Sequence, residues 1–342
     1  MRSSLLFAVL ILAHPTFAQS KAAVKMETSV RSLLAKGKIY KARTKCDAAL
    51  VREPLPLFYV LRADANNRIG DHAKAVEDAR TGLKGLPASS EALLQLAIAE
   101  QGLGLADSAI AHFQHVLGQM PSTEAHYYLA LAYQSKHDGP QALSELNSAG
   151  AGGVENVQLG ARILRAKGEC HMMANDTLTA KADFDQAIAL TPDDPVIFNS
   201  RGWLLYAATG QYAKAVADFD RAIKINPNYS YAFNNRGWCR YKMGQKEKAI
   251  ADIERALKRK ASNPFAYRNL GIIALESGDK PQACVHFRSA LENNFTQLFG
   301  AEVQGLVDTH CAGLEIKQDP AKMPNAPLDK PLTVPTPRTN AP

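Results

Sequence analysis

One alanine column constrains this chain more than any other feature of its sequence. Its eight members recur at intervals of 33, 34, 33, 38, 35, 34 and 34 residues. They are Ala42, Ala75, Ala109, Ala142, Ala180, Ala215, Ala249 and Ala283. A period of this length indicates stacked supersecondary units, each of which packs mainly on its neighbours. We therefore predict an array of eight repeats over residues 23–297.

Other columns keep fixed distances from the alanines. Five residues before them the chain has glycine in six repeats, and His137 and Asn175 in the other two. Such a position suits a left-handed turn between two helices, which favours glycine and then asparagine. Small or apolar residues recur four and seven residues after each alanine, on the same helical face. A second small column precedes the alanines by twelve or thirteen residues, at Val30, Ala63, Ala97, Ala130, Gly168, Gly202, Gly237 and Gly271.

This pattern resembles the tetratricopeptide repeat, with its 34-residue period and its Gly…Ala-x-x-x-Phe…Pro skeleton. The Ala-x-x-x-Phe element is present at Ala109–Phe113, Ala180–Phe184, Ala215–Phe219 and Ala283–Phe287. The resemblance implies an all-α fold, a right-handed α-α superhelix of about eight helical hairpins plus a C-terminal capping helix.

The predicted organisation has five segments. They are a signal peptide (1–18), repeats one to four (19–156), repeats five to eight (157–297), a capping helix (298–314) and a disordered proline-rich tail (315–342). The fourth repeat lacks its terminal proline and is followed by Gly150–Gly153, which indicates a looser joint between two blocks. A continuous superhelix with one long loop is the alternative.

The cap is predicted from the apolar face of Val303, Leu306, Val307, Cys311 and Leu314.

The N-terminus has the pattern of an export signal. Arg2 precedes the apolar run Leu5–Ala13, and small residues flank Phe17. The run has nine residues, and a membrane anchor needs about 18–20. We expect cleavage after Ala18 and a periplasmic or secreted protein, with no membrane span elsewhere.

We find no pattern that indicates catalysis. His-Glu-x-x-His, Gly-x-Ser-x-Gly, phosphate-loop and Cys-x-x-Cys motifs do not occur. His112 and His115 are expected to face outwards, and no third metal ligand is evident beside them. Charged clusters such as Asp218–Arg221 are interpreted as solvated helix faces. The formal charge of +7 does not indicate nucleic acid. We expect neither an enzyme nor a metal or cofactor site.

The resemblance also implies a binding surface. Family positions 2, 5, 9 and 12 of each first helix face a concave groove that binds a protein or peptide. In repeats six to eight these positions predict a groove that includes Asn199, Trp203, Tyr206, Tyr231, Asn234, Trp238, Tyr241, Phe265 and Arg268, besides Val196. Core packing is the alternative for these aromatic residues, but Phe198, Phe233 and Tyr267 already occupy the family's packing positions. The basic residues of the carboxylate clamp found in some relatives are missing.

The first repeat is basic. Nine Lys or Arg residues lie between Gln19 and Leu55 against three acidic residues. A solvated capping repeat explains this composition, and contact with an anionic lipid or envelope polymer is the alternative.

The five cysteines leave at least one thiol unpaired within the chain. Exported tetratricopeptide proteins with a similar C-terminal pattern suggest that Cys284 and Cys311 are bridged. The other three, Cys46, Cys170 and Cys239, are expected to be buried.

Overall fold

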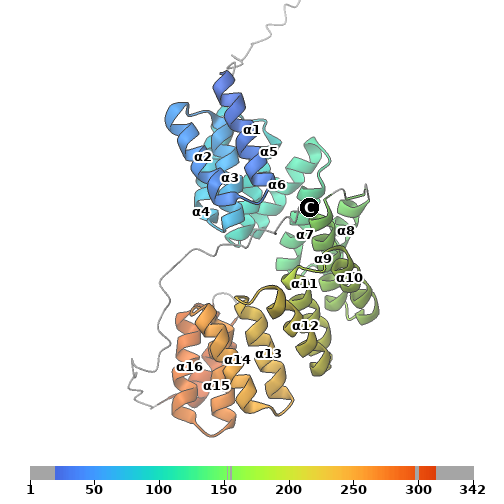
Figure 1. Ribbon diagram of the computed structural model, residues 1–342, viewed down its shortest axis with the longest axis vertical. Coiled ribbons are helices and arrows are strands. Elements are labelled where there is room, and N and C mark those ends of the chain that lie inside the picture. Colours follow the sequence, from blue (N-terminus) through green and yellow to red (C-terminus); the bar gives the residue numbers. More distant parts are fainter. Residues whose placement is uncertain (1–19, 152, 155, 297–299, 313–342) are drawn as a thin grey trace, which may run out of the picture. The chain divides into compact units, whose positions relative to one another are not determined.

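The computed structural model describes residues 20–151, 153–154, 156–296 and 300–312, and within these ranges it contains helices and no strand (Figure 1). The predicted signal peptide and proline-rich tail lie outside the described residues. The chain divides into two compact units, Met1–Gly152 and Gly153–Pro342, at the glycine-rich joint. None of the described helices is both long and apolar enough to cross a membrane.

The first unit contains four helical hairpins (Figure 1). Their helices are α1 (Lys21–Ala35), α2 (Ile39–Arg52), α3 (Pro56–Ile69), α4 (His72–Gly85), α5 (Ser90–Gly102), α6 (Ala106–Gln119), α7 (Thr123–Ser135) and α8 (Gly139–Gly150). Within this unit α2 packs on α3, α4 on α5 and α6 on α7, so each hairpin contacts the next one.

The second unit continues the pattern with four more hairpins and a cap. Its elements are α9 (Val157–Met173), α10 (Thr177–Leu190), α11 (Pro195–Ser200), η1 (Arg201–Ala207), α12 (Tyr212–Ile225), α13 (Ser230–Lys242), α14 (Lys246–Arg259), α15 (Pro264–Glu276), α16 (Lys280–Glu292) and α18 (Glu302–His310). The all-helical hairpin fold predicted from the sequence is confirmed.

The turn column has the backbone conformation predicted for it. All eight positions have φ between 59° and 88°, including His137 and Asn175, where glycine is replaced. The alanine column is fully buried, at 0% exposure in every repeat, as is the column four residues later. Alanine at these positions lets the two helices of a hairpin approach closely, and the larger side chain beside it fills the remaining space.

The cap is the short helix α18, which packs on α16. Its Val303 is fully buried, and Leu306 and Val307 pack against the same cluster. A disulfide joins Cys284 of α16 to Cys311, with Cα atoms 5.7 Å apart. Of the predicted apolar face, Leu314 lies outside the described residues.

Repeat six departs from regular helix. Its first helix begins as α11 and continues as the π-helix η1. This repeat is also the one in which the small column precedes the alanine by thirteen residues instead of twelve. A π-helical turn accommodates one additional residue, so η1 absorbs the insertion while Gly202 stays in its packing position.

Candidate binding surface on the first helices of repeats six to eight

A chain of side-chain amides connects the first helices of three repeats. Asn235 donates to Asn199 (3.1 Å) and Asn234 to Asn235 (3.1 Å). Asn269 donates to Asn234 (3.0 Å), and Arg268 donates to Asn269 (2.9 Å). We call these five residues the asparagine ladder. Because every bond runs in the same direction, each amide polarises the next one.

The members of the ladder differ in accessibility. Asn234 and Asn269 are buried, at 2% and 4% exposure, so these two side chains connect the helices. Asn199 and Asn235 are half-buried. The Nδ2 group of Asn199 makes no hydrogen bond to any described residue, so its two N–H donors remain for another molecule.

Trp238 lies between two cations. The Arg268 guanidinium carbon is 5.2 Å from its ring centroid, and Lys242 Nζ is 4.8 Å from it. The Tyr241 ring is 5.9 Å away. Arg268 also pairs with Glu302 of the cap, with 3.2 Å between Nε and Oε2. These contacts hold the half-buried indole in place and leave part of its surface accessible.

The remaining predicted residues do not share one environment. Trp203, on η1, is 38% exposed. Tyr231 is half-buried and accepts a hydrogen bond from Lys260 at 3.0 Å, while Phe265 packs its ring on Phe295, 5.6 Å away. Tyr206 is 8% exposed and belongs to a core cluster, because the π-helix shifts the register after Trp203. The structure therefore keeps both tryptophans accessible but buries Tyr206 and Asn234.

Tyr241 shows one marked electrostatic effect. Its hydroxyl donates to the Glu276 carboxylate, which raises the pKa of Tyr241 to about 12. The phenol therefore stays a neutral hydrogen-bond donor over the physiological range.

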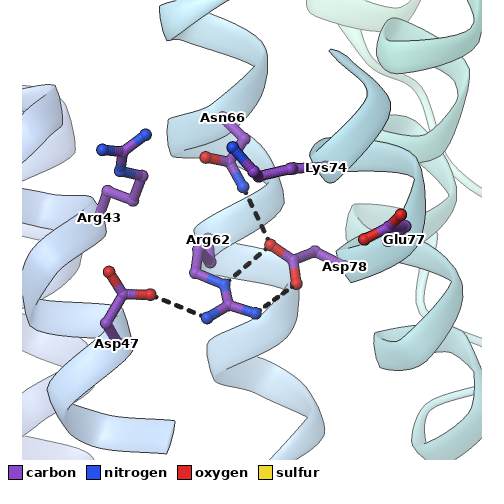
Figure 2. A pocket seen from close by; sticks show the side chains of 7 residues that line it. All are labelled: Arg43, Asp47, Arg62, Asn66, Lys74, Glu77 and Asp78. Carbon is purple, nitrogen blue, oxygen red and sulfur yellow. Dashed lines mark hydrogen bonds and ion pairs between the residues drawn. The ribbon is translucent and has the colours of Figure 1, made fainter. Parts of the chain in front are cut away.

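The interpretation of the charged clusters as solvated faces is wrong for Asp78, Asp218 and Asp252, which are buried. Asp218 is 5% exposed and accepts two hydrogen bonds from Arg201, at 2.8 and 2.6 Å. The same arrangement joins Arg236 to Asp252 and Arg62 to Asp78, the last visible in Figure 2. In all three cases the arginine also pairs with an aspartate of the preceding repeat, at Asp185, Asp220 and Asp47 respectively.

These bidentate pairs join the two helices of a hairpin and connect it to its neighbour. A sequence signal for them exists. The arginines directly precede the small column of the first helix, and the buried aspartates directly precede the column four residues after the alanine.

The comparisons with known proteins agree with this architecture. A TPR repeat model matches residues 204–244, and a tetratricopeptide repeat model matches residues 230–263. The chain thus contains tetratricopeptide repeats, and its helical hairpins have the fold of tetratricopeptide-repeat structures. The matched segment contains Trp238, Tyr241 and the Arg236–Asp252 pair of this tetratricopeptide-repeat protein. A search of curated protein sequences returned no match.

Solved structures share its fold. The crystal structure of the APC/C hetero-tetramer Cut9–Hcn1 superposes with a TM-score of 0.62 at 16% identity, covering 82% of this chain and 55% of that one. The chain thus spans about half the length of that relative. A tetratricopeptide repeat protein from Parabacteroides merdae gives 0.59 at 19% identity over 74% and 98% of the two chains. The human IFIT1 dimer with PPP-AAAA gives 0.59 at 17%, over 78% and 71%. These identities show similarity of fold alone.

The structure also gives the environment of two buried thiols and of His112. Burial raises the pKa of the Cys46 and Cys239 thiols to about 12, which keeps them protonated. His112, expected to face outwards, is half-buried and bonds Glu100 with 2.7 Å between Nδ1 and Oε2. The described residues contain no cluster of three side chains able to hold a metal ion.

Proposed function

We propose that this tetratricopeptide-repeat protein is a non-enzymatic scaffold that binds an extended segment of a partner protein along the first helices of repeats six to eight. Tetratricopeptide repeats in general serve as protein-interaction scaffolds. The observation that carries the proposal is the open end of the asparagine ladder, where Asn199 and Asn235 lie half-buried. Amide side chains hydrogen-bond the main chain of an extended peptide, whatever its side chains are.

The two tryptophans supply the apolar part of this surface. Trp203 is 38% exposed, and Trp238 presents an indole fixed by Arg268 and Lys242. Rigid aromatic side chains contribute large contact area at low entropic cost and dominate many protein interfaces. We expect partner side chains to pack on these rings while the ladder binds the partner's main chain.

Co-purification with matched variants tests the proposal. Wild type, a Trp203→Ala/Trp238→Ala variant and a Leu178→Ala/Leu190→Ala control are compared at equal helicity. Leu178 and Leu190 are exposed apolar residues of the same unit that lie outside the proposed surface. A partner retained by the control and lost from the tryptophan variant is the expected result. Identical sets from all three proteins would refute the role of the tryptophans.

Tryptophan fluorescence gives a direct second measurement. The chain has two tryptophans, and both lie on the proposed surface. Binding of the purified partner should therefore shift the emission maximum. Unchanged emission at saturating partner would place the interface elsewhere.

The basic first repeat supports a second candidate function, attachment to an anionic envelope polymer or lipid. Six of its cations are exposed and form no ion pair with the described residues. They are Lys21, Lys25, Lys36, Lys38, Lys41 and Arg52. Attachment of this kind should weaken steeply between low and moderate salt, whereas binding to the tryptophan surface should change little. Salt-insensitive binding to anionic vesicles would contradict this second function.

We propose that the scaffold works after export. The apolar N-terminal run and the Cys284–Cys311 bridge support this location, since disulfides persist in oxidising compartments. The intact mass of the native protein should correspond to a chain beginning at Gln19. A mature protein that retains Met1–Ala18 would contradict cleavage.

A further inference from the structure

A cavity of about 290 Å³ lies in the first unit, among helices α2, α3 and α4 (Figure 2). Its lining is entirely polar or charged: Arg43, Asp47, Arg62, Asn66, Lys74, Glu77 and Asp78. One water molecule takes roughly 30 Å³ in the liquid, so the space is larger than a single bridging water needs. It is close to the lower end of the size range of small-molecule sites.

Most of the lining groups already have partners. Arg62 donates two hydrogen bonds to Asp78, at 2.9 and 2.7 Å, and one to Asp47 at 2.8 Å. Lys74 at the rim pairs with Asp71, 2.6 Å away. These bonds make the floor of the cavity rigid and occupy its inner charges.

Asn66 is the exception on the floor. It is 2% exposed, and its Nδ2 donates to Asp78 at 3.0 Å. Because a carboxylate paired with a guanidinium only accepts, this bond fixes the orientation of the amide and leaves Oδ1 as the free atom. Among the described residues, Asn66 Oδ1 is the buried side-chain polar atom without any hydrogen-bond partner. A buried acceptor of this kind takes its donor from a water molecule or from a bound ligand.

Two rim charges are also unpaired. Arg43 of α2 lies over the Tyr40 ring, 5.8 Å from its centroid, and has no ion pair to a described residue. Glu77 of α4 likewise has no ion-pair partner within the described ranges. Figure 2 shows Arg43 and Glu77 on opposite sides of the cavity, with Asn66 on the helix between them. The cavity thus offers a cation on one wall, an anion on the other and an acceptor on the floor.

We propose that this cavity binds the zwitterion of a free α-amino acid. The ligand carboxylate pairs with Arg43, its ammonium group donates to Asn66 Oδ1, and the exposed Glu77 side chain turns toward that ammonium group. Guanidinium and carboxylate form two parallel hydrogen bonds, and an ammonium group brings the donors that Asn66 lacks. A simple anion would leave Asn66 unsatisfied and approach Glu77, and a simple cation would approach Arg43 and Lys74. The site lies in the first unit, so the inference is independent of the proposed partner surface.

Calorimetric titration of the full chain with L-alanine, L-leucine and L-glutamine, each alone, tests the inference. We expect saturable one-to-one binding of at least one of them. N-acetylation of that amino acid, which removes the ammonium group, should weaken binding at least tenfold, and so should amidation of its carboxylate. Absence of binding by all three would overturn the inference, because the cavity would then hold solvent alone. Equal binding of either capped form would overturn it as well.

Two charge-removing variants and one control variant provide a second test of the binding site. Arg43→Gln and Glu77→Gln should each weaken binding at least tenfold, while the far-UV circular dichroism spectrum stays that of wild type. Arg52→Gln is the matched control, because it removes the same charge from an exposed position on the same helix, α2. Retention of wild-type affinity by Arg43→Gln, or an equal loss in Arg52→Gln, would show that the ligand binds elsewhere. The N-acetylated and the amidated amino acid are titrated into the wild-type protein alone. The conclusion drawn from them therefore does not depend on how the variants fold.

Discussion

Replacement of Asp252 by asparagine should strongly destabilise the seventh repeat. The carboxylate is 0% exposed and accepts hydrogen bonds from Arg236 at 2.7 and 2.6 Å and from Arg240 at 2.6 Å. The Arg236 side chain is itself only 10% exposed. Removing one partner of a buried ion pair typically costs about 3–5 kcal/mol, because the other charge stays buried. Arg236 keeps its bond to Asp220, so we expect the lower end, about 3 kcal/mol.

Asp220→Asn is the matched control. It makes the same chemical change to a second partner of the same guanidinium, but the Asp220 side chain is 51% exposed. Ion pairs with a solvated partner contribute about 0–1 kcal/mol. The two variants therefore isolate the effect of burial, with the arginine and the charge change held constant.

Urea unfolding followed by tryptophan fluorescence measures both variants. Trp238 is two residues from Arg236 and Trp203 lies in the preceding repeat, so the signal reports repeats six and seven. Far-UV circular dichroism of the same samples shows whether the other repeats unfold with it, since repeat arrays need not unfold in one step. Equal midpoints for Asp252→Asn and Asp220→Asn would refute the argument from burial.

Three further predictions concern other parts of the chain. Ala215 is fully buried, so Ala215→Leu should overpack the hairpin and cost about 1–3 kcal/mol; an unchanged calorimetric melting curve would contradict the repeat register. Cys284→Ser opens a bridge between positions 27 residues apart and should destabilise the cap by about 3 kcal/mol, and amide exchange in α18 that stays as slow as in wild type would count against this. Burial lowers the pKa of His286 from 6.5 to about 4, so between these values the unfolded chain binds a proton that the folded chain does not. Stability should therefore fall as the pH drops from 6.5 to 4, by up to about 3 kcal/mol, and a His286→Gln variant with the same pH slope in urea titrations would refute the assignment.

Much of the fold could be predicted from the sequence because its determinants are local and repeated. The alanine column marks the closest helix contact, and each of its members is fully buried in the structure. The turn column requires positive φ, and His137 and Asn175 adopt it although neither is glycine. Because the pattern recurs eight times, a residue that differs from it in one repeat does not obscure it. The hairpins could therefore be located along the sequence without tertiary information.

The candidate surface was only partly predictable. The groove positions implied by the family resemblance include both tryptophans. Those positions assume a regular α-helix, whereas the π-helix directs Tyr206 into the core. The spacing of thirteen residues between Gly202 and Ala215 carried the signal for this insertion. Asn235 is not among the predicted groove residues, because its bond to Asn199 depends on how two neighbouring repeats stack.

The sequence by itself determined the number of hairpins, the positions of their turns and the columns that pack between them, because small residues at a fixed period admit close helix contacts at those positions alone. Only the tertiary structure decided which polar residues are buried. Asp218 and Asp220 are two residues apart on one helix, yet one is 5% exposed and the other has a side chain that is 51% exposed. The Arg–Asp pairs and the asparagine ladder join residues of different helices, and the unpaired acceptor of Asn66 lies in a cavity lined by three helices. A helical period gives the face of a charged residue, and the neighbouring helix decides whether that face meets water or a partner.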